Sequence, residues 1–387
     1  MSARPRLAFI VTEDWFFAER FLVMGQVAKR CGYDVYIIAR ERTHRTMIEA
    51  EGFTLIPLEA ERRSINPIAF LWAVWRLRGL LKRLRPDVVH CIAIKSIVMG
   101  GLASNSAGIE KRIYAPTGLG VFADGTVPLA VWARSLIVWL IRHKLETRRT
   151  TYLCENYDDP RAFGLDPADP GKVRIVGGAG IDPANFVPSP LPPLPPLRIA
   201  IVSRMLWTKG IDTAVEAVTM ARQSGLAVEL SLYGAPDDAS VQSISESQLR
   251  AWSERDGIAW HGATQDVPAV WRAHHVCCVP SRGGEGLPRA LLEGAASGRA
   301  LLTTNVSGCG EFVRHGVDGY VVPPHNAVEM CSAIKTLAKS HEQLEVMAAS
   351  ARQRVLNGYT LSDVAKCVES VYAGKREASS DFLASDR

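Results

Sequence analysis

The sequence predicts an α/β protein of two Rossmann-like parallel-sheet domains that face each other across a cleft. The chain has 387 residues, which is too long for one ordinary core and suits two domains. Short apolar runs alternate with helical patterns in both halves, as in parallel sheets that carry helices on both faces. A proline-rich segment at residues 187–196 separates the two series and is predicted to be an extended interdomain linker.

The first domain is predicted over residues 1–186. Its strands are expected at residues 7–11, 35–39, 54–57, 88–91, 112–115, 152–154 and 173–176. Helices are expected at residues 19–30, where Gly32 closes the last turn, and at 68–85 and 127–149.

The second domain is predicted over residues 197–359. Its strands are expected at residues 197–202, 227–233, 258–261, 276–280, 300–303 and 320–322, with helices at 212–223 and 245–255. A helical pattern runs over 344–373, and residues 360–376 are expected to form a C-terminal helix that packs back on the first domain. Residues 377–387 are polar and are expected to be a frayed tail.

Composition and charge restrict the class of protein. The eight cysteines lack paired spacing, which favours a reducing compartment and argues against a zinc site or a disulfide framework. No signal peptide is expected, because the apolar run Leu7–Val11 is only as long as a strand. Residues 1–150 hold 23 Lys and Arg against 13 Asp and Glu, while the remainder holds 22 against 27. The basic half is therefore expected to face an anionic partner.

Two carboxylates, Glu285 and Glu293, lie eight residues apart where a predicted strand gives way to a glycine-rich turn and a helix. The helix is expected to begin near Leu287 and Pro288, which places Glu285 at its mouth and Glu293 about two turns in. Ligands of open α/β sheets bind beyond the carboxyl ends of strands. The alternative is a pair of solvated surface acids.

Two cations follow the first strand of the second domain. Arg204 offers a planar fork to phosphate oxygens, and Lys209 offers a mobile charge on the same loop, so together they suit a diphosphate without a metal. A second glycine-rich stretch contains Gly308 and Gly310, whose backbone N–H groups suit an anion. Solvated cations and an ordinary loop are the alternatives.

These motifs resemble the donor domain of the retaining, GT-B-fold glycosyltransferases of family 4. In the first half, Asp14-Trp-Phe-Phe-Ala-Glu-Arg20, Arg85-Pro-Asp-Val-Val-His90, Lys95 and Thr117-Gly-Leu-Gly120 resemble the bacterial branch that acts on polyprenyl-diphosphate-linked saccharides. The resemblance covers residues 7–370, and its specificity comes from the joint occurrence of the motifs.

The resemblance implies transfer of a hexose or N-acetylhexosamine from a UDP-sugar to a lipid-diphosphate-linked saccharide. Arg204, Lys209 and Glu285 are then the catalytic residues, the two cations on the leaving diphosphate and the carboxylate near the transferred sugar. The sign of each group fits the reaction, because negative charge grows on the leaving oxygen and positive charge on the anomeric carbon. No cofactor and no metal are expected, since the sequence lacks an Asp-x-Asp triplet.

The resemblance also implies the binding residues. The donor contacts are expected from Glu293 on the ribose, from the backbone of Gly286 and Leu287, and from Asp14 and Trp15. Residues on the acceptor side are expected among His90, Lys95, Thr117 and Gly118.

The sequence departs from the family at three positions. Many members carry a His in the loop that here reads Ala115-Pro-Thr-Gly-Leu-Gly120. Either backbone groups take over its role or the branch differs. His90 ends the predicted strand at 88–91 and could reach the cleft, although a lone His there is more often structural. Asn305 and Gly310 stand where related sequences often have an acidic and a basic residue, so the resemblance does not fix the donor.

Two segments of the first half suggest a membrane surface as partner. Residues 68–85 begin with Phe, Leu and Trp and end with five cations, and residues 127–149 repeat this order. Neither segment suits a bilayer span, but both suit a helix lying on an anionic membrane. The expected location is cytoplasmic and peripheral, on the inner face of a bacterial cell membrane. Ordinary helices packing on the sheet are the alternative.

Other functions are weighed by their motifs. A dehydrogenase is set aside because no Gly-x-Gly-x-x-Gly follows the first strand. Nucleic acid is a poor partner because the tryptophans lie within apolar runs. A transferase with a soluble acceptor, a UDP-sugar epimerase, a phosphorylase, and a nonenzymatic protein that binds nucleotide and membrane remain as alternatives.

Overall fold

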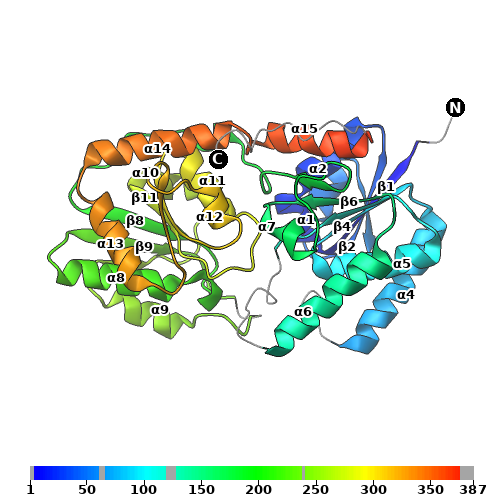
Figure 1. Ribbon diagram of the computed structural model, residues 1–387, viewed down its shortest axis with the longest axis horizontal. Coiled ribbons are helices and arrows are strands. Elements are labelled where there is room, and N and C mark those ends of the chain that lie inside the picture. The colour runs from blue at the N-terminus through cyan, green and yellow to red at the C-terminus, as the bar shows by residue number, and fades with distance from the viewer. Residues whose placement is uncertain (1–3, 61–65, 119–127, 238–239, 375–387) are drawn as a thin grey trace. The chain divides into compact units, whose positions relative to one another are not determined.

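The computed structural model describes residues 4–60, 66–118, 128–237 and 240–374, and these form two compact units (Figure 1). The first unit contains the chain up to Ala179 together with the segment that begins at Leu361, and the second unit is Gly180–Thr360. The predicted fold class, two Rossmann-like parallel-sheet domains, is confirmed.

The first unit is built on a seven-stranded sheet in the order β3-β2-β1-β4-β5-β6-β7, with every pairing parallel. Its strands are β1 (Arg6–Glu13), β2 (Asp34–Arg40), β3 (Thr54–Pro57), β4 (Val88–Ile92), β5 (Arg112–Ala115), β6 (Thr150–Cys154) and β7 (Val173–Ile175). Its helices are α1 (Asp14–Arg20), α2 (Leu22–Arg30), α3 (Arg45–Ala50), α4 (Pro67–Leu84), α5 (Ile94–Ala107), α6 (Pro128–Leu140), the π-helical turn η2 (Ile141–Leu145), α7 (Asp158–Ala162) and α15 (Leu361–Tyr372).

Helices cover both faces of this sheet. One hydrophobic cluster joins α1, α2 and α15 to the strands, and the other joins α4, α5 and η2 to the strands. The predicted helix at 19–30 is wrong in its bounds, because the chain turns at Phe21 between α1 and α2. Likewise, the helical pattern over 344–373 is two helices, the second being α15, which packs beside α2 (Figure 1).

The second unit is built on a six-stranded parallel sheet in the order β10-β9-β8-β11-β12-β13. Its strands are β8 (Leu197–Val202), β9 (Val228–Tyr233), β10 (Ile258–Trp260), β11 (Val276–Val279), β12 (Ala300–Thr304) and β13 (Gly319–Val322). Its helices are the 3₁₀ turns η3 (Pro183–Asn185) and η4 (Trp207–Lys209), α8 (Ile211–Gln223), α9 (Glu246–Ser253), α10 (Val267–Ala273), α11 (Arg289–Ala296), α12 (Cys309–Phe312), α13 (Ala327–Leu337) and α14 (His341–Leu356). All residues of β11 and β12 are buried, as expected for central strands covered on both faces.

The proline-rich segment 187–196 packs on the second unit. The buried Arg299 donates to the carbonyl and hydroxyl oxygens of Ser189, at 2.6 and 2.7 Å. His275 bonds the carbonyl of Pro192 at 2.9 Å, and Leu191 and Leu194 pack against the hydrophobic core. An extended proline-rich chain leaves its carbonyl groups free, and here buried side chains bind them, so the boundary between the units lies earlier, at Gly180, and not at residue 187.

Candidate functional site

The strand order of the second unit places the motif loops together. β8 pairs with β9 on one side and with β11 on the other, so the chain reverses its direction of winding between β8 and β11. Ligands of open α/β sheets bind at the carboxyl ends of the strands at this switch point. The loops that follow β8 and β11 carry the predicted residues Arg204, Lys209 and Glu285.

Lys209 and Glu285 form an ion pair across this switch point. Lys209 Nζ lies 2.5 Å from Glu285 Oε1, and the side chains are 16% and 28% exposed. The hydroxyl of Ser281 donates to the same carboxylate oxygen at 3.1 Å. The structure therefore places one cation and one carboxylate together at the carboxyl edge of the sheet, and Ser281 helps to orient the carboxylate.

Arg282 fastens the loop after β11 to the loop after β8. Its guanidinium donates to the carboxylate of Asp212 at 2.6 Å and to the carbonyl of Trp207 at 3.1 Å. Its backbone N–H donates to the carbonyl of Thr208 at 2.9 Å. Asp212 lies in the first turn of α8, and Gly210 is the N-cap of this helix.

Two glycines allow the loops to approach closely. Gly210 has φ +67°, and a Cβ there would collide with the carbonyl oxygen of Pro280. Gly308, the N-cap of α12, has φ +76°, and a Cβ there would collide with the carbonyl oxygen of Gly286. The glycine-rich loop after β12 thus packs against the backbone next to Glu285, where only glycine fits.

Cys309 follows this glycine and is fully buried. Burial raises the pKa of its thiol to about 12, and the negative charge of Glu285 adds to the rise. The thiol therefore stays neutral, and it fills space beneath the site without adding charge.

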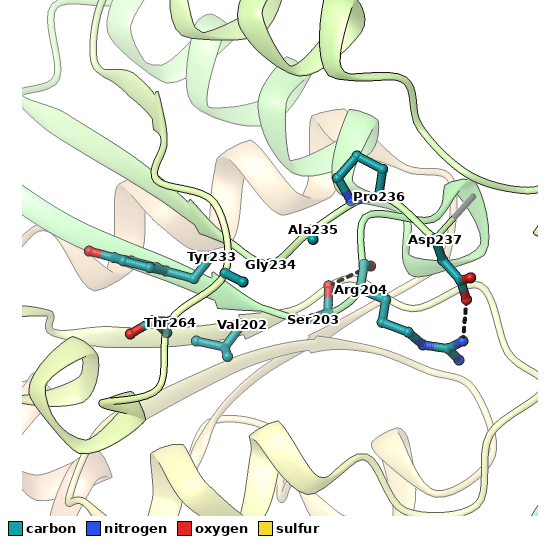
Figure 2. Close-up of a pocket in the computed structure, with 10 residues that line it drawn as sticks. Val202, Ser203, Arg204, Tyr233, Gly234, Ala235, Pro236, Asp237 and Thr264 are labelled. Atoms are coloured by element: carbon teal, nitrogen blue, oxygen red, sulfur yellow. Dashed lines mark hydrogen bonds and ion pairs between the residues drawn. The ribbon is translucent and has the colours of Figure 1, made fainter. Parts of the chain in front are cut away.

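Arg204 points to the other side of β8. Its guanidinium lies 2.8 Å from the carboxylate of Asp237, which follows β9, and its side chain is 51% exposed. Arg204 and Asp237 are among the residues that line an open pocket of ≈ 540 Å³ at the ends of β8 and β9, and Figure 2 shows them paired there. The lining residues include Val202, Ser203, Tyr233, Gly234 and Thr264.

The two predicted cations thus hold different partners. Lys209 faces Glu285 at the end of β11, and Arg204 faces the pocket at the end of β9. An anion bound between them would cross the carboxyl end of β8.

Glu293 lies in α11, about one turn from its start, and not about two turns in as predicted. Its side chain is 10% exposed, and Arg289 Nε lies 2.8 Å from its carboxylate. Its contact with a ribose stays a prediction.

Asp14 is hydrogen-bonded to backbone groups of the first unit. Its carboxylate is buried and accepts hydrogen bonds from the N–H groups of Trp15, Arg42 and His44, at 2.7, 2.7 and 3.0 Å. These bonds tie the start of α1 to the loop after β2. The donor contacts of Asp14 and of the half-buried Trp15 stay predictions. The carboxylate of Asp14 is buried, so it is not exposed for a contact with the donor.

His90 is enclosed in the first unit, which corrects the expectation that it could reach a ligand. Its ring is buried against Phe9, and Nδ1 lies 2.9 Å from the hydroxyl of Tyr372 on α15. Lys95 lies in the first turn of α5, Thr117 is half-buried and Gly118 is buried. The acceptor roles of these last three residues stay predictions.

Burial of His90 predicts a dependence of stability on pH. Burial lowers the pKa of its imidazole to about 3. The unfolded chain then takes up a proton below its ordinary pKa of about 6.5 while the folded chain does not, so stability falls as the pH drops through that value. Between pH 7 and pH 5 the protonation of His90 in the unfolded chain should lower the free energy of unfolding by about 2 kcal/mol.

The measurement is urea unfolding at both pH values for the wild type and for His90→Gln. The variant should show a smaller loss between the two pH values, whatever its stability at pH 7. An equal loss in both proteins would mean that His90 is protonated in the folded state.

Three residues of the site were not singled out from the sequence. Ser281 and Arg282 lie between the predicted strand at 276–280 and Glu285, so their position could have identified them. Asp237 follows β9, and only its place at a strand end would have drawn attention to it. In the described ranges, no group of three or more His, Cys, Asp or Glu side chains is arranged to hold a metal ion.

Two parallel-sheet α/β domains with this site at the switch point define a member of the GT-B class of glycosyltransferases. A family model described as "Glycosyl transferase 4-like" matches residues 6–150, and one described as "Glycosyl transferases group 1" matches residues 196–340. Together the two models match most of the chain, which belongs to this glycosyltransferase family.

Two curated relatives match over most of their length. The chain is 25% identical over 348 residues to the N,N'-diacetylbacillosaminyl-diphospho-undecaprenol alpha-1,3-N-acetylgalactosaminyltransferase of Campylobacter jejuni, covering 84% of this chain and 86% of that one. It is 19% identical over 350 residues to the UDP-Gal:alpha-D-GlcNAc-diphosphoundecaprenol alpha-1,3-galactosyltransferase of Escherichia coli, covering 88% and 89%.

Solved structures share the fold at low identity. Anabaena Alr3699/HepE in complex with UDP and glucose matches with a TM-score of 0.75 and 15% identity, over 96% of this chain and 100% of that chain. Sucrose-phosphate synthase from Thermosynechococcus elongatus matches with a TM-score of 0.77 and 17% identity, over 96% and 99%.

Proposed function

We propose that this glycosyltransferase moves a hexose or N-acetylhexosamine from a UDP-sugar to a lipid-diphosphate-linked saccharide, with retention at the anomeric carbon and without a metal. The observation that carries the proposal is the ion pair of Lys209 and Glu285 at the switch point. Transfer of a glycosyl group needs a fixed positive charge at the leaving phosphate and a negative charge at the anomeric carbon. This pair supplies both signs at one place.

The pocket and the two cations give the donor an orientation. The nucleoside enters the pocket beyond β9, where Arg204 lies at the rim, and the diphosphate crosses the end of β8 between Arg204 and Lys209. The sugar then lies at Glu285. Arg204 exchanges Asp237 for a phosphate oxygen when the donor binds, because a phosphate takes more charge-assisted bonds than a carboxylate at the rim of an open pocket.

The acceptor hydroxyl attacks from the face that the phosphate leaves, and the departing phosphate takes its proton. In this route Glu285 stabilises charge and needs no proton-transfer role. The acceptor class is supported by the names of the Campylobacter jejuni and Escherichia coli relatives, both of which specify an undecaprenyl-diphosphate-linked sugar. The enzyme is expected to act at the cytoplasmic face of the membrane.

The experiment offers the protein a panel of UDP-sugars with a short-chain polyprenyl-diphosphate-linked N-acetylglucosamine. The expected result is a disaccharide whose new bond has the anomeric configuration of the donor, read by NMR, with activity that survives EDTA. Glu285→Gln is the control for contaminating transferases.

Each other outcome identifies an alternative. Strict dependence on magnesium or manganese contradicts the metal-free proposal, and an inverted product contradicts retention. Release or epimerisation of the sugar without an acceptor supports an epimerase, and attack by inorganic phosphate supports a phosphorylase. Transfer only to free saccharides supports a soluble acceptor.

A further inference from the structure

The most exposed tryptophans among the described residues lie on two helices of the first unit. The protein has nine tryptophans. Large exposed Trp side chains occur at Trp72 and Trp75 on α4 and at Trp132 and Trp139 on α6. Isolated exposed apolar residues are common, but a grouped apolar surface marks an interaction site.

α4 carries two apolar stripes where packing on the sheet needs one. Ala73, Leu77 and Leu81 are buried in the core at a spacing of four residues. Ile68, Leu71, Trp72 and Trp75 recur at helical spacing on the solvent side, and Ile68 and Trp75 are 77% and 66% exposed. The inward stripe packs on the sheet, as expected for a helix of a Rossmann-like domain. The outward stripe is exposed and is not needed for this packing.

α6 repeats this arrangement. Trp132, Leu136 and Trp139 follow one helical stripe, and Trp132 and Leu136 are 78% and 64% exposed. Its inward side chains Ile137 and Val138 pack against the same hydrophobic cluster that holds α4.

Cations follow the aromatic residues of α4, and further cations follow α6 in η2. On α4 these are the exposed Arg76, Arg78, Lys82 and Arg83, and Lys144 of η2 follows α6. The guanidinium of Arg76 lies 4.7 Å from the ring centroid of Trp72. α4, α6 and η2 contain no Asp or Glu. An anionic surface would therefore meet no negative charge on these helices that repels it.

The topology orients both helices in the same direction. α4 connects β3 to β4 and α6 connects β5 to β6, and in parallel sheets such crossover helices begin at the carboxyl edge of the strands. The first half of α4, with Trp72 and Trp75, and Trp132 of α6 thus lie toward the edge where this fold class binds ligands. In Figure 1 both helices begin at the lower edge of the first unit.

We infer that α4 and α6 form a docking surface for an anionic lipid bilayer, with the tryptophans in the interface and the cations on lipid phosphates. Tryptophan suits the membrane interface because its ring is apolar and its N–H is polar. A second copy of this chain fits less well, because two basic surfaces without acids repel each other. No helix in the described part of the chain is long and apolar enough to cross a membrane, so the contact is superficial.

This inference goes beyond the transfer reaction, and its purpose rests on the proposed lipid-linked acceptor. An acceptor on a polyprenyl carrier has its reactive hydroxyl near the bilayer surface. Docking through the carboxyl edge of the first sheet would bring that edge to the acceptor.

The test is flotation of the full-length protein with phosphatidylglycerol vesicles and with phosphatidylcholine vesicles. The wild type should bind phosphatidylglycerol at low salt and lose affinity as salt rises. Trp72→Gln with Trp75→Gln, and separately Trp132→Gln with Trp139→Gln, should each lower the partition coefficient by about tenfold or more. Arg78→Gln, Lys82→Gln and Arg83→Gln together should lower it roughly a hundredfold at low salt.

Matched controls lie outside the docking surface. Val328→Gln with Val346→Gln removes two apolar side chains, each 64% exposed, from the second unit. Arg250→Gln, Arg272→Gln and Lys366→Gln remove three exposed cations. Both controls should float like the wild type.

A second readout is quenching of tryptophan fluorescence by brominated phosphatidylglycerol, which should occur in the wild type and be lost in the variant without the four surface tryptophans. Wild-type protein that stays unbound at low salt, or surface variants that float like the wild type, would overturn the inference. So would a lipid-free dimer that the tryptophan variants dissociate, because a second copy would then cover the surface.

Failure of docking and failure of the proposed function give different results. Transfer to a short-chain acceptor in the absence of vesicles, without flotation of the wild type, would leave the reaction standing and remove the docking surface. Flotation without transfer to any acceptor would do the reverse.

Discussion

Lys209→Ala should lower kcat of sugar transfer by about 100- to 1000-fold, the usual loss when one preorganised stabiliser of developing negative charge is removed. The lysine reaches the site from the loop after β8, with its side chain 16% exposed, so little water is available to replace its charge. The effect should fall mainly on kcat, because the charge on the leaving phosphate grows during the reaction. Steady-state kinetics with a fixed acceptor and varied donor measure it.

The contact with Glu285 supplies a sharper control. Lys209→Arg keeps the positive charge and should recover part of the activity. In a double-mutant cycle, Lys209→Ala and Glu285→Gln should lose less together than the product of their separate effects, because the two side chains touch at 2.5 Å. A rise in KM with unchanged kcat would instead make Lys209 a ground-state binding residue.

Glu285→Gln should lower kcat by about 100-fold and leave donor binding nearly unchanged. Glutamine has the shape of glutamate and can still accept the hydrogen bond from Ser281, but it lacks the negative charge that an oxocarbenium-like sugar attracts. Glu293→Gln is the matched comparison. Its expected contact, the ribose, is the same before and in the transition state, so that variant should mainly raise the dissociation constant of the donor.

Donor titration by calorimetry and single-turnover kinetics separate the two carboxylates. Normal turnover of Glu285→Gln would contradict its catalytic role. If Glu293→Gln lowers kcat and leaves affinity unchanged, the two roles are exchanged.

The local motifs could be predicted from the sequence because each depends on a short stretch of chain. The βα alternation predicted two parallel sheets, and the glycine-rich turn before α11 predicted a crevice with Glu285 at its mouth. The aromatic and basic halves of α4 were also visible in its sequence. In these cases the period or the order of residue types carries the information.

The partners of each side chain depended on contacts between segments far apart in the chain. From the sequence, Arg204 and Lys209 were predicted to bind one diphosphate from the same loop. In the structure, β8 pairs with both β9 and β11, and Arg204 contacts Asp237 on one side whereas Lys209 contacts Glu285 on the other. Likewise, His90 is the third residue of β4 and does not end the strand as predicted, and α15 returns from the far end of the chain and encloses it.

The sequence by itself determined the fold class, the family resemblance and the candidate charges, because periodicity and short motifs are local properties of the chain. Only the tertiary structure decided that the segment 187–196 is held by Arg299, which side of β8 each cation serves, and which tryptophans are exposed. The physical reason is that burial and pairing depend on strand order and on which faces the helices cover, and those are set by the packing of the whole sheet.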